Sequence, residues 1–468
     1  MNTFWKKAVV LFTLLTLVAG LSVGCGTQGG AEEEMVLRYN LGTEPEILDS
    51  AKATGQPEFT VLNALFEGLV RLDENYQPQP AMVEDWEISP DGLTYTFCLR
   101  EGIKWSSGDP VTAEDFEYAW LRVLNPETGA DYAYQLWCIK GAYDYTAGTG
   151  SAHDVAIEAV DERTLRVTLE QPAPYFLSLM AFPTYFPVHK ATVEQFGDAY
   201  GAEAENLVTN GPFKLVKWEH RSILELLPLE DYWDRDAVKL DKLEIYTVEE
   251  ASTELAMFET GDLDILDNPP LEEMPRLKEE GLVIGGDLAT YYYIFNVEKE
   301  PFDDLRVRKA FAYAINRQLL VDSITQAGQK PAMAFVPYGI INPTTNKDFR
   351  EEGGAYFKDN DVETARRLLA EVGYPKGEGL PPIEILMNDS EAHVRIAQAI
   401  GQMWKEDLGV KEIKFRTEEW GDYLTTRDEG DFQVARAGWG ADYLDPMTFL
   451  DMWLKDGGNN NSNWWDPR

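Results

Sequence analysis

A short segment late in the chain carries groups that could bind both ends of a peptide. It starts at Arg436 and reads Arg-Ala-Gly-Trp-Gly-Ala-Asp-Tyr. The guanidinium of Arg436 matches the two oxygens of a carboxylate, and the carboxylate of Asp442 could pair with an ammonium group. If Ala437, Gly438 and Trp439 form an exposed strand, their backbone could pair with an extended peptide whatever its side chains are. The alternative interpretation is a core strand followed by a turn.

The sequence carries no recognisable catalytic or metal-binding signature. Its GxSxG match, at residues 20–24, lies in an apolar N-terminal run and lacks the strand–turn–helix context of a nucleophile. No CxxC or HExxH motif occurs, and there are only 4 histidines. Neighbouring acids, such as Asp262 with Asp264 or Glu418 with Glu419, are not oriented as a catalytic pair. We therefore expect no catalytic residues, no metal and no cofactor.

The N-terminus has the three-part form of a secretory signal. Lys6 and Lys7 precede an apolar run at 8–20, and small residues then lead to Cys25. The run is too short and wrongly flanked for a lasting transmembrane helix.

The residues before Cys25 read Leu-Ser-Val-Gly and resemble a bacterial lipobox, although Ser22 stands where an aliphatic residue is usual. We expect a signal segment at 1–25 with Cys25 lipidated, plain secretion being the alternative, and a flexible tether at 26–34.

Composition limits the size and the partners of the protein. The chain has 468 residues, of which 44% are hydrophobic, enough for two or three domains. Its net charge of -40 would repel nucleic acid and anionic lipid, so neither is an expected partner. With Cys25 assigned to lipid, Cys98 and Cys138 could form one disulfide, but the sequence does not decide whether they meet.

Apolar periodicity predicts alternating strands and helices. We expect strands at 36–41, 93–100, 164–169, 238–246, 291–296, 383–387 and 413–416. Helices are expected at 59–69, 112–123, 250–260, 304–321, 362–372 and 393–408. No Gly-rich phosphate loop interrupts this alternation, which favours a mixed α/β protein with more than one lobe.

Six stretches of the chain, in order, resemble one protein family. They are LRYNLGTEPEILD (37–49), LFEGLV (65–70), WEISPDGLTYTFCLREGIKWSSGDPVTAEDF (86–116), TNGPFKL (209–215), YYYIFNVEKEPFDDLRVRKAFAYAINR (291–317) and RAGWGADYLDPMTFL (436–450). The resemblance is to the bacterial extracytoplasmic solute-binding proteins of the peptide and nickel transporter class (family 5), and most strongly to their oligopeptide-binding group. It covers nearly all of the chain after the tether.

The resemblance implies an α/β fold: a two-lobed, periplasmic-binding-protein-like clamp of type II with an additional inserted domain. Lobe I would comprise 35–79 and 206–303, the inserted domain II 80–205, and lobe III 304–468. Members of the family continue beyond the point where this chain ends, so the resemblance also implies a lobe III that is truncated at its C-terminus.

The resemblance assigns the ends and the backbone of a bound peptide to particular residues. Asp442 would pair with the α-ammonium. The backbone of Ala437, Gly438 and Trp439 would pair with the peptide from one lobe. The loop formed by Thr54, Gly55 and Gln56 would pair with it from the other lobe.

The remaining assignments concern the carboxylate and the side chains of the peptide. Arg436, Arg427 and His393 would act as cations that receive the C-terminal carboxylate of peptides of different lengths. Trp420 and Trp439 would line side-chain pockets. The alternative is that Arg427 and His393 are simply solvated on exposed helices and that the two tryptophans belong to the core.

In function, the resemblance implies a monomeric oligopeptide-binding lipoprotein that delivers peptides to the permease of an ABC importer. It would be anchored through Cys25 at the outer face of the cytoplasmic membrane or in the periplasmic space. Alternatives are the same clamp with another solute (a dipeptide, nickel chelate, haem or oligosaccharide), a signalling receptor for peptides, or, more distantly, a peptide-processing or cell-wall enzyme.

Overall fold

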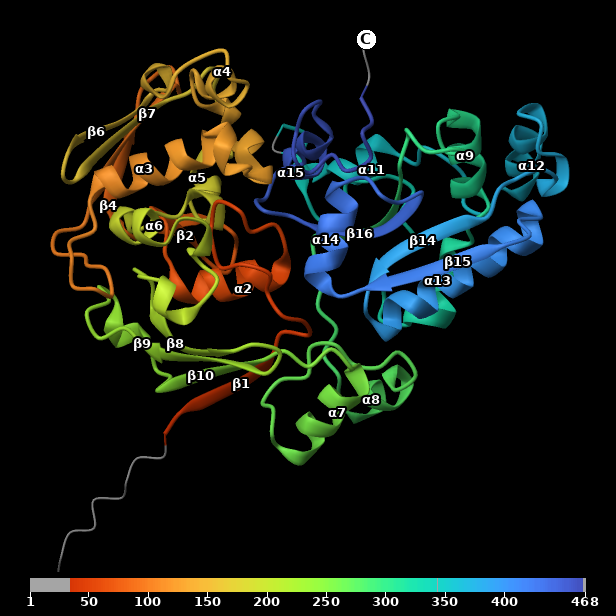
Figure 1. The fold of residues 1–468 in the computed structure, drawn as a ribbon, viewed down its shortest axis with the longest axis horizontal. Coiled ribbons are helices and arrows are strands. Elements are labelled where there is room, and N and C mark those ends of the chain that lie inside the picture. Colours follow the sequence, from red (N-terminus) through yellow and green to blue (C-terminus); the bar gives the residue numbers. More distant parts are fainter. Residues whose placement is uncertain (1–33, 343, 466–468) are drawn as a thin grey trace, which may run out of the picture. The chain divides into compact units, whose positions relative to one another are not determined.

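The computed structural model describes residues 34–342 and 344–465. The expected signal segment, Cys25 and the tether up to residue 33 lie outside the described residues. From Val36 onward the chain forms one compact unit (Figure 1). Among the described helices, none has the length and apolar character needed to cross a membrane.

The first sheet joins the start of this unit to residues more than 170 positions later. Strand β1 (Val36–Asn40) pairs in parallel with β10 (Lys242–Tyr246), and β9 (Ile223–Pro228) and β8 (Phe213–Glu219) continue the sheet in antiparallel order. Helix α2 (Gln56–Leu65) follows β1; proline in its first turn has the backbone angle that a helix start requires. Its buried face includes Phe59, Leu62 and Leu65.

The second sheet is antiparallel and consists of residues from the expected inserted domain. Its order is β4 (Val83–Ile88), β5 (Thr94–Leu99), β7 (Thr164–Thr168) and β6 (Ile157–Asp161). Alternate residues of β5 are buried, as the sequence pattern predicts. Helix α3 (Ala113–Leu124) begins at a capping box formed by Thr112 and Asp115. The 3-10 segment η2 (Asp131–Cys138) follows it.

The third sheet has the order β11 (Ala289–Phe295), β16 (Val434–Gly440), β14 (Ile383–Asn388) and β15 (Ile413–Glu418). Helices α9 (Leu305–Tyr313), α12 (Val362–Glu371) and α13 (Glu391–Met403) contribute to its core, around Phe311 and Trp404. Strand β11 lies in the range expected for lobe I, yet it pairs with β16 along its whole length. The expected end of lobe I at 303 therefore falls after a strand of the third sheet.

The sequence predicted one helix over 304–321, and this prediction is wrong. Helix α9 ends at Tyr313, and a separate helix, α10 (Arg317–Leu320), begins after Asn316. The side chain of Asn316 accepts a hydrogen bond from the Leu319 amide at 2.9 Å, so it caps the new helix.

The remaining elements are short and connect the three sheets. The helices are α4 (Ala142–Thr146), α5 (Phe176–Leu179), α6 (Lys190–Phe196), α7 (Ala251–Thr260), α8 (Met274–Glu280), α11 (Phe349–Gly353), α14 (Trp420–Asp428) and α15 (Met447–Leu450). The strands are β2 (Val70–Leu72), β3 (Pro78–Pro80), β12 (Ile341–Asn342) and β13 (Lys347–Asp348). Cys98 and Cys138 are both free thiols.

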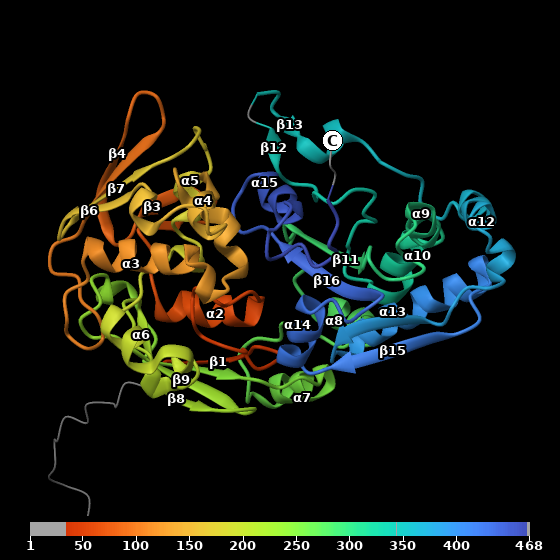
Figure 2. The ribbon, with the colours of Figure 1, turned by 45° about the horizontal axis from the view of Figure 1, so that its top comes forward.

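The segment after β16 packs into the core shared by the first and second sheets. Trp439, near the end of β16, and Tyr443, Phe449 and Met452, which follow the strand, all belong to that core, although β16 itself is part of the third sheet. In Figure 2 the dark-blue segment that carries α15 lies between the elements of the first two sheets and those of the third sheet. Strand β16 therefore ends where residues from all parts of this unit meet.

Candidate functional site

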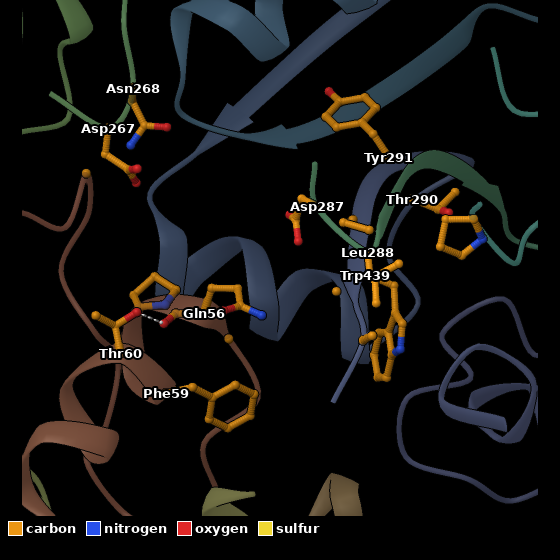
Figure 3. Close-up of a pocket in the computed structure, with 18 of the residues that line it drawn as sticks. Gln56, Phe59, Thr60, Asp267, Asn268, Asp287, Leu288, Thr290, Tyr291 and Trp439 are labelled. Atoms are coloured by element: carbon orange, nitrogen blue, oxygen red, sulfur yellow. Dashed lines mark hydrogen bonds between the residues drawn. The ribbon is translucent and has the colours of Figure 1, made fainter. Parts of the chain in front are cut away.

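A cleft of about 2140 Å³ lies where these parts meet. Figure 3 shows Gln56, Phe59 and Thr60 of α2 on one side of it and Tyr291 and Trp439 on the other. Pockets for compact small molecules measure roughly 300–1,000 Å³, so this space suits a longer ligand. Within the described residues, no group of three or more His, Cys, Asp or Glu side chains could hold a metal ion.

The cleft brings together nearly all of the residues that the sequence analysis selected. Those that line it are Thr54, Gly55, Gln56, His393, Trp420, Arg427, Arg436, Gly438, Trp439 and Asp442. Ala437 does not line it.

Strand β16 has one fully paired edge and one partly open edge. Along one edge, every residue from Val434 to Gly440 pairs with β11. Along the other, pairing with β14 is confined to Val434 and Ala435. From Arg436 onward, no strand of the described residues pairs with the second edge, so an extended ligand could add one there.

The alternation of the strand shows which backbone groups face this open edge. The Asn296 amide donates to the Gln433 carbonyl, and the Ala441 amide donates to the Leu288 carbonyl. Odd-numbered residues of β16 therefore direct their backbone toward β11, and even-numbered residues direct theirs away from it. The backbone groups of Gly438 and Gly440 thus face the open edge.

This direction corrects two of the expected backbone contacts. Ala437 and Trp439 were expected to pair with a peptide, but their backbone groups already face β11, where they lie opposite Tyr292 and Thr290. Gly438 remains in place, and Gly440, which the sequence analysis did not select, takes the second position.

Asp442 lies just past the end of β16 with little to balance its charge. Its Oδ2 accepts a hydrogen bond from Gln135 Nε2 at 2.8 Å, and its amide donates to Thr448 Oγ1 at 3.0 Å. No lysine, arginine or histidine of the described chain forms an ion pair with it. Burial, together with the nearby Asp451 carboxyl, raises the pKa of Asp442 well above its ordinary value.

Arg436, near the start of the open edge, has the opposite imbalance. Its Nη1 donates to Asn388 Oδ1 at 3.1 Å, and its guanidinium lies 5.0 Å from the ring centre of Tyr291. Its buried Nε has no partner, and no carboxylate of the described residues pairs with it. Strand β16 therefore has a free cation near one end and a free carboxyl near the other.

Arg427 and His393 are not the solvated surface groups that the alternative interpretation required. The Arg427 side chain is 14% exposed; its Nη2 lies 3.5 Å from Asp428 Oδ1, and its Nε is buried without a partner. His393 Nδ1 lies 3.3 Å from the Tyr291 hydroxyl. Burial, and then the charge of Arg436, lower the pKa of His393 to about 2. This direction favours the neutral imidazole, so in the unliganded arrangement His393 can offer a ligand a hydrogen bond.

The two tryptophans have different surroundings. Trp439 Nε1 donates to the Thr448 carbonyl at 2.6 Å, and its ring stacks on Tyr132 with centres 5.9 Å apart. It is thus both a core residue and part of the cleft wall. Trp420 stacks on Tyr423 at 5.7 Å, and its Nε1 donates to Glu58 Oε1 at 3.2 Å. Trp420 therefore joins α14 to α2.

The loop at Thr54, Gly55 and Gln56 leads into α2, with Gly55 as the residue before its first turn. A Cβ at Gly55 would lie 2.6 Å from Trp420 Cζ2 and 2.4 Å from Glu58 Oε2, so only glycine permits this approach. Burial raises the pKa of Glu58 to about 7.

Four residues of the site escaped the sequence analysis. They are Glu58, Gln135, Gly440 and Thr448. The alternation that selected Gly438 could also have selected Gly440. Gln135 lies 307 residues from its partner Asp442, so no local pattern could have revealed it.

Comparison with known proteins places this geometry in a family. The family described as bacterial extracellular solute-binding proteins, family 5 Middle, matches residues 77–461. The chain belongs to this family. It is 40% identical over 473 residues to the oligopeptide-binding protein OppA of Bacillus subtilis, an alignment that covers 98% of this chain and 85% of that protein.

Solved structures agree with the fold. The structure of Haemophilus influenzae OppA in complex with RPPGFSPFR has a TM-score of 0.87 and 35% identity, covering 93% of this chain and 86% of that one. The two-lobed α/β clamp expected from the sequence is thus confirmed. A murein tripeptide-binding protein, MppA, in its unliganded open form has a TM-score of only 0.59 at 34% identity, with coverage of 93% and 84%.

Proposed function

We propose that this protein binds oligopeptides in the cleft between its lobes. The observation that carries the proposal is the open edge of β16, which has an unpaired carboxyl, Asp442, at one end and an unpaired guanidinium, Arg436, at the other. An extended peptide with free ends has an ammonium, a row of backbone donors and acceptors, and a carboxylate in the same order. It therefore complements all three parts of the strand at once.

In this proposal the ammonium of the peptide pairs with Asp442 and its backbone pairs with Gly438 and Gly440. Thr54, Gly55 and Gln56 contact it from the opposite wall. Arg436 receives the carboxylate of short peptides, and Arg427 and His393 receive that of longer ones. Trp420 and Trp439 border the side-chain pockets.

Selectivity in such a site rests on the ends of the peptide. Main-chain pairing gives affinity without reading side chains, and a roomy cleft tolerates many of them. Charge pairing in a dry cleft is strong because water does not compete for it. The protein should accordingly accept many sequences but reject peptides with blocked ends.

We also propose that the protein works outside the cytoplasm and passes peptides to the permease of an ABC importer. Its similarity to OppA proteins supports this role, and three of those relatives carry the word periplasmic in their names. Lipidation of Cys25 would hold it at the membrane, and a single copy would suffice for binding. The proposed domains keep their expected ranges, except that β11 joins lobe III.

Calorimetry of the purified protein against tri- to pentapeptide pools tests the proposal. We expect binding of peptides with free ends, a rise in melting temperature, and weak binding after N-acetylation or C-terminal amidation. No heat and no thermal shift with any pool would refute it. Analysis of the peptides after long incubation distinguishes a binding protein, which returns them intact, from a peptide-processing enzyme.

A further inference from the structure

Gln135 lies behind the Asp442 carboxyl and comes from a different part of the protein. It belongs to η2, within the segment expected to form the inserted domain, whereas Asp442 follows β16. The backbone carbonyl of Gln135 is fixed by the Tyr185 hydroxyl at 2.8 Å, so the start of its side chain is held in place. Its Nε2 then reaches Asp442 Oδ2 at 2.8 Å.

The amide of Gln135 is poorly used by the fold itself. Its Oε1 is buried, and no described residue donates a hydrogen bond to it. A buried acceptor without a donor destabilises the folded state, and an apolar side chain of similar shape would avoid this cost. Among the described residues, the contact with Asp442 is the one hydrogen bond of this side chain. The amide is thus better explained by that contact than by packing.

The type of donor also matters. A lysine or arginine at this place would pair permanently with Asp442 and would compete with the ammonium of a ligand for the carboxylate. The neutral amide occupies Oδ2 and leaves Oδ1 available, because a carboxylate can accept from both of its oxygens. It also favours the ionised carboxylate without neutralising it.

We propose that Gln135 is a positioning residue for Asp442, which orients the carboxyl toward the cleft and sets the pH at which it exchanges a proton for the ammonium of the ligand. This inference rests on the proposed function and deepens it. At pH values below the raised pKa of Asp442, the carboxyl of the empty cleft carries a proton. When a peptide ammonium arrives, the O–H bond breaks, the proton passes to solvent, and the carboxylate pairs with the ammonium. Charge and atoms balance, and no further reactant is needed.

The groups around Asp442 favour this exchange. Asp451 of the 3-10 segment η11 (Asp451–Trp453) faces it, with an unpartnered Oδ1 and a carboxyl that accepts from the Tyr443 hydroxyl at 2.8 Å. Tyr132 and Tyr134 of η2 face the same region. The charge of Arg427 lowers the pKa of Tyr132, and the ion pair found for Arg427 within the described residues is with Asp428. A second acid and neutral phenols surround the carboxyl, so the empty site disfavours its charge.

The sign of the pH effect follows. Burial raises the pKa of Asp442 in the empty protein, and a bound ammonium lowers it again. Between these two pKa values, binding releases a proton and the affinity rises with pH. Above the pKa of Asp442 in the empty site, binding releases no proton, and the affinity no longer changes with pH.

Calorimetry of the full-length protein in two buffers of different ionisation enthalpy tests the proton exchange. A tripeptide with free ends should release a proton, and its N-acetylated form should release none. Binding of the free tripeptide without proton release at any pH from mildly acidic to neutral would overturn the inference. Absence of binding would instead count against the proposed function.

Variants of Gln135 test whether this residue positions the Asp442 carboxyl. In Gln135→Met, the pH midpoint of binding should move upward, and affinity for free-amino peptides should fall about 10-fold or more below that midpoint. N-acetylated peptides should bind as before. Asn206→Leu is the matched control: Asn206 is also buried, its amide donates to the Ala199 carbonyl at 2.8 Å, and it does not line the cleft.

Two results decide the role of the amide. A shifted midpoint in Gln135→Met but not in Asn206→Leu supports positioning, because a purely structural defect would not change the pH response selectively. An unchanged midpoint and an unchanged preference for free over acetylated peptides would refute it. Should the Met variant fold poorly, Gln135→Glu provides the second case: another acid beside Asp442 should raise the midpoint further.

Discussion

The two ends of the open edge of β16 have opposite charge imbalances and unlike surroundings. At the acid end, Asp442 is held by Gln135 and Thr448, which come from two different segments. At the basic end, Arg436 lies on Tyr291 and donates to Asn388, and both of these partners belong to the third sheet. One end is thus assembled by several parts of the protein, and the other end by a single sheet.

This difference suggests different tasks for the two ends. A carboxyl whose charge is disfavoured until a ligand arrives makes a fixed anchor for the start of a peptide. The guanidinium of Arg436, which lies on an aromatic ring, is a permanent cation. It can accept a carboxylate directly or leave it to Arg427 when the peptide is longer. We therefore expect the acid end to determine position and the basic end to tolerate length.

The largest effect should come from Asp442→Asn. Removing one partner of a buried charge pair costs about 2–5 kcal/mol, so affinity for free-amino peptides should fall by that amount. Calorimetry with free and N-acetylated peptides measures it. Equal losses for both kinds of peptide would show that Asp442 does not read the ammonium.

The same variant makes a prediction about stability. Because burial raises the pKa of Asp442, the empty protein should lose stability as pH rises through that pKa, while the unfolded chain ionises at lower pH. Asp442→Asn should remove this loss and melt at a higher temperature near neutral pH. Thermal melts of the variant and the parent protein across the acid-to-neutral range measure it. A variant that melts at a lower temperature than the parent at every pH would contradict the conclusion that the Asp442 charge lacks a partner in the empty protein.

Arg436→Met should have the next largest effect. A hydrogen bond to a charged group contributes about 1.5–3 kcal/mol, so short peptides with a free carboxylate should lose that much. Their C-terminal amides should lose little, which provides the matched control. The comparison of the two ends would fail if longer peptides lost as much as tripeptides, because the basic end would then not tolerate length.

Between these two ends, the pairing of the peptide backbone with the open edge of β16 should be measurable one backbone group at a time. Replacing a single peptide N–H by an ester oxygen removes a donor that could face Gly438 or Gly440, which should cost about 0.5–1.5 kcal/mol. Only alternate positions of the peptide should respond, because only alternate residues of β16 face the open edge. Calorimetry of an ester scan gives the pattern, and a uniform response would exclude strand addition.

The smallest effect should come from His393→Gln. Because the pKa of His393 is lowered to about 2, its imidazole should show no titration in NMR spectra between about pH 5 and 8. His220 is the internal contrast: despite partial desolvation, its bond to Glu44 raises its pKa, so it should titrate above the ordinary value. Binding of tetrapeptides should change little in the variant, and a titration of His393 near neutral pH would restore it as a cation.

Sequence patterns predicted the fold and one strand of the site well. The alternation of β5, the capping box of α3 and the segment around Asp442 were readable because their causes are local. The break between α9 and α10 was not, since it depends on one side-chain cap at Asn316. Which residues of β16 direct their backbone groups toward the open edge depends on which strand lies on each side of it. The alternation of apolar residues does not reveal this.

Gly55 has a consequence for the time that a ligand stays bound. The structure leaves no room for a Cβ between this residue, Trp420 and Glu58, so a single absent methyl group determines how closely α2 and α14 can approach. Differences in affinity among related complexes arise mostly in the rate of dissociation. Any larger residue at position 55 would hold α2 and α14 farther apart, so we expect Gly55→Ala to shorten the time that a bound peptide stays in the cleft.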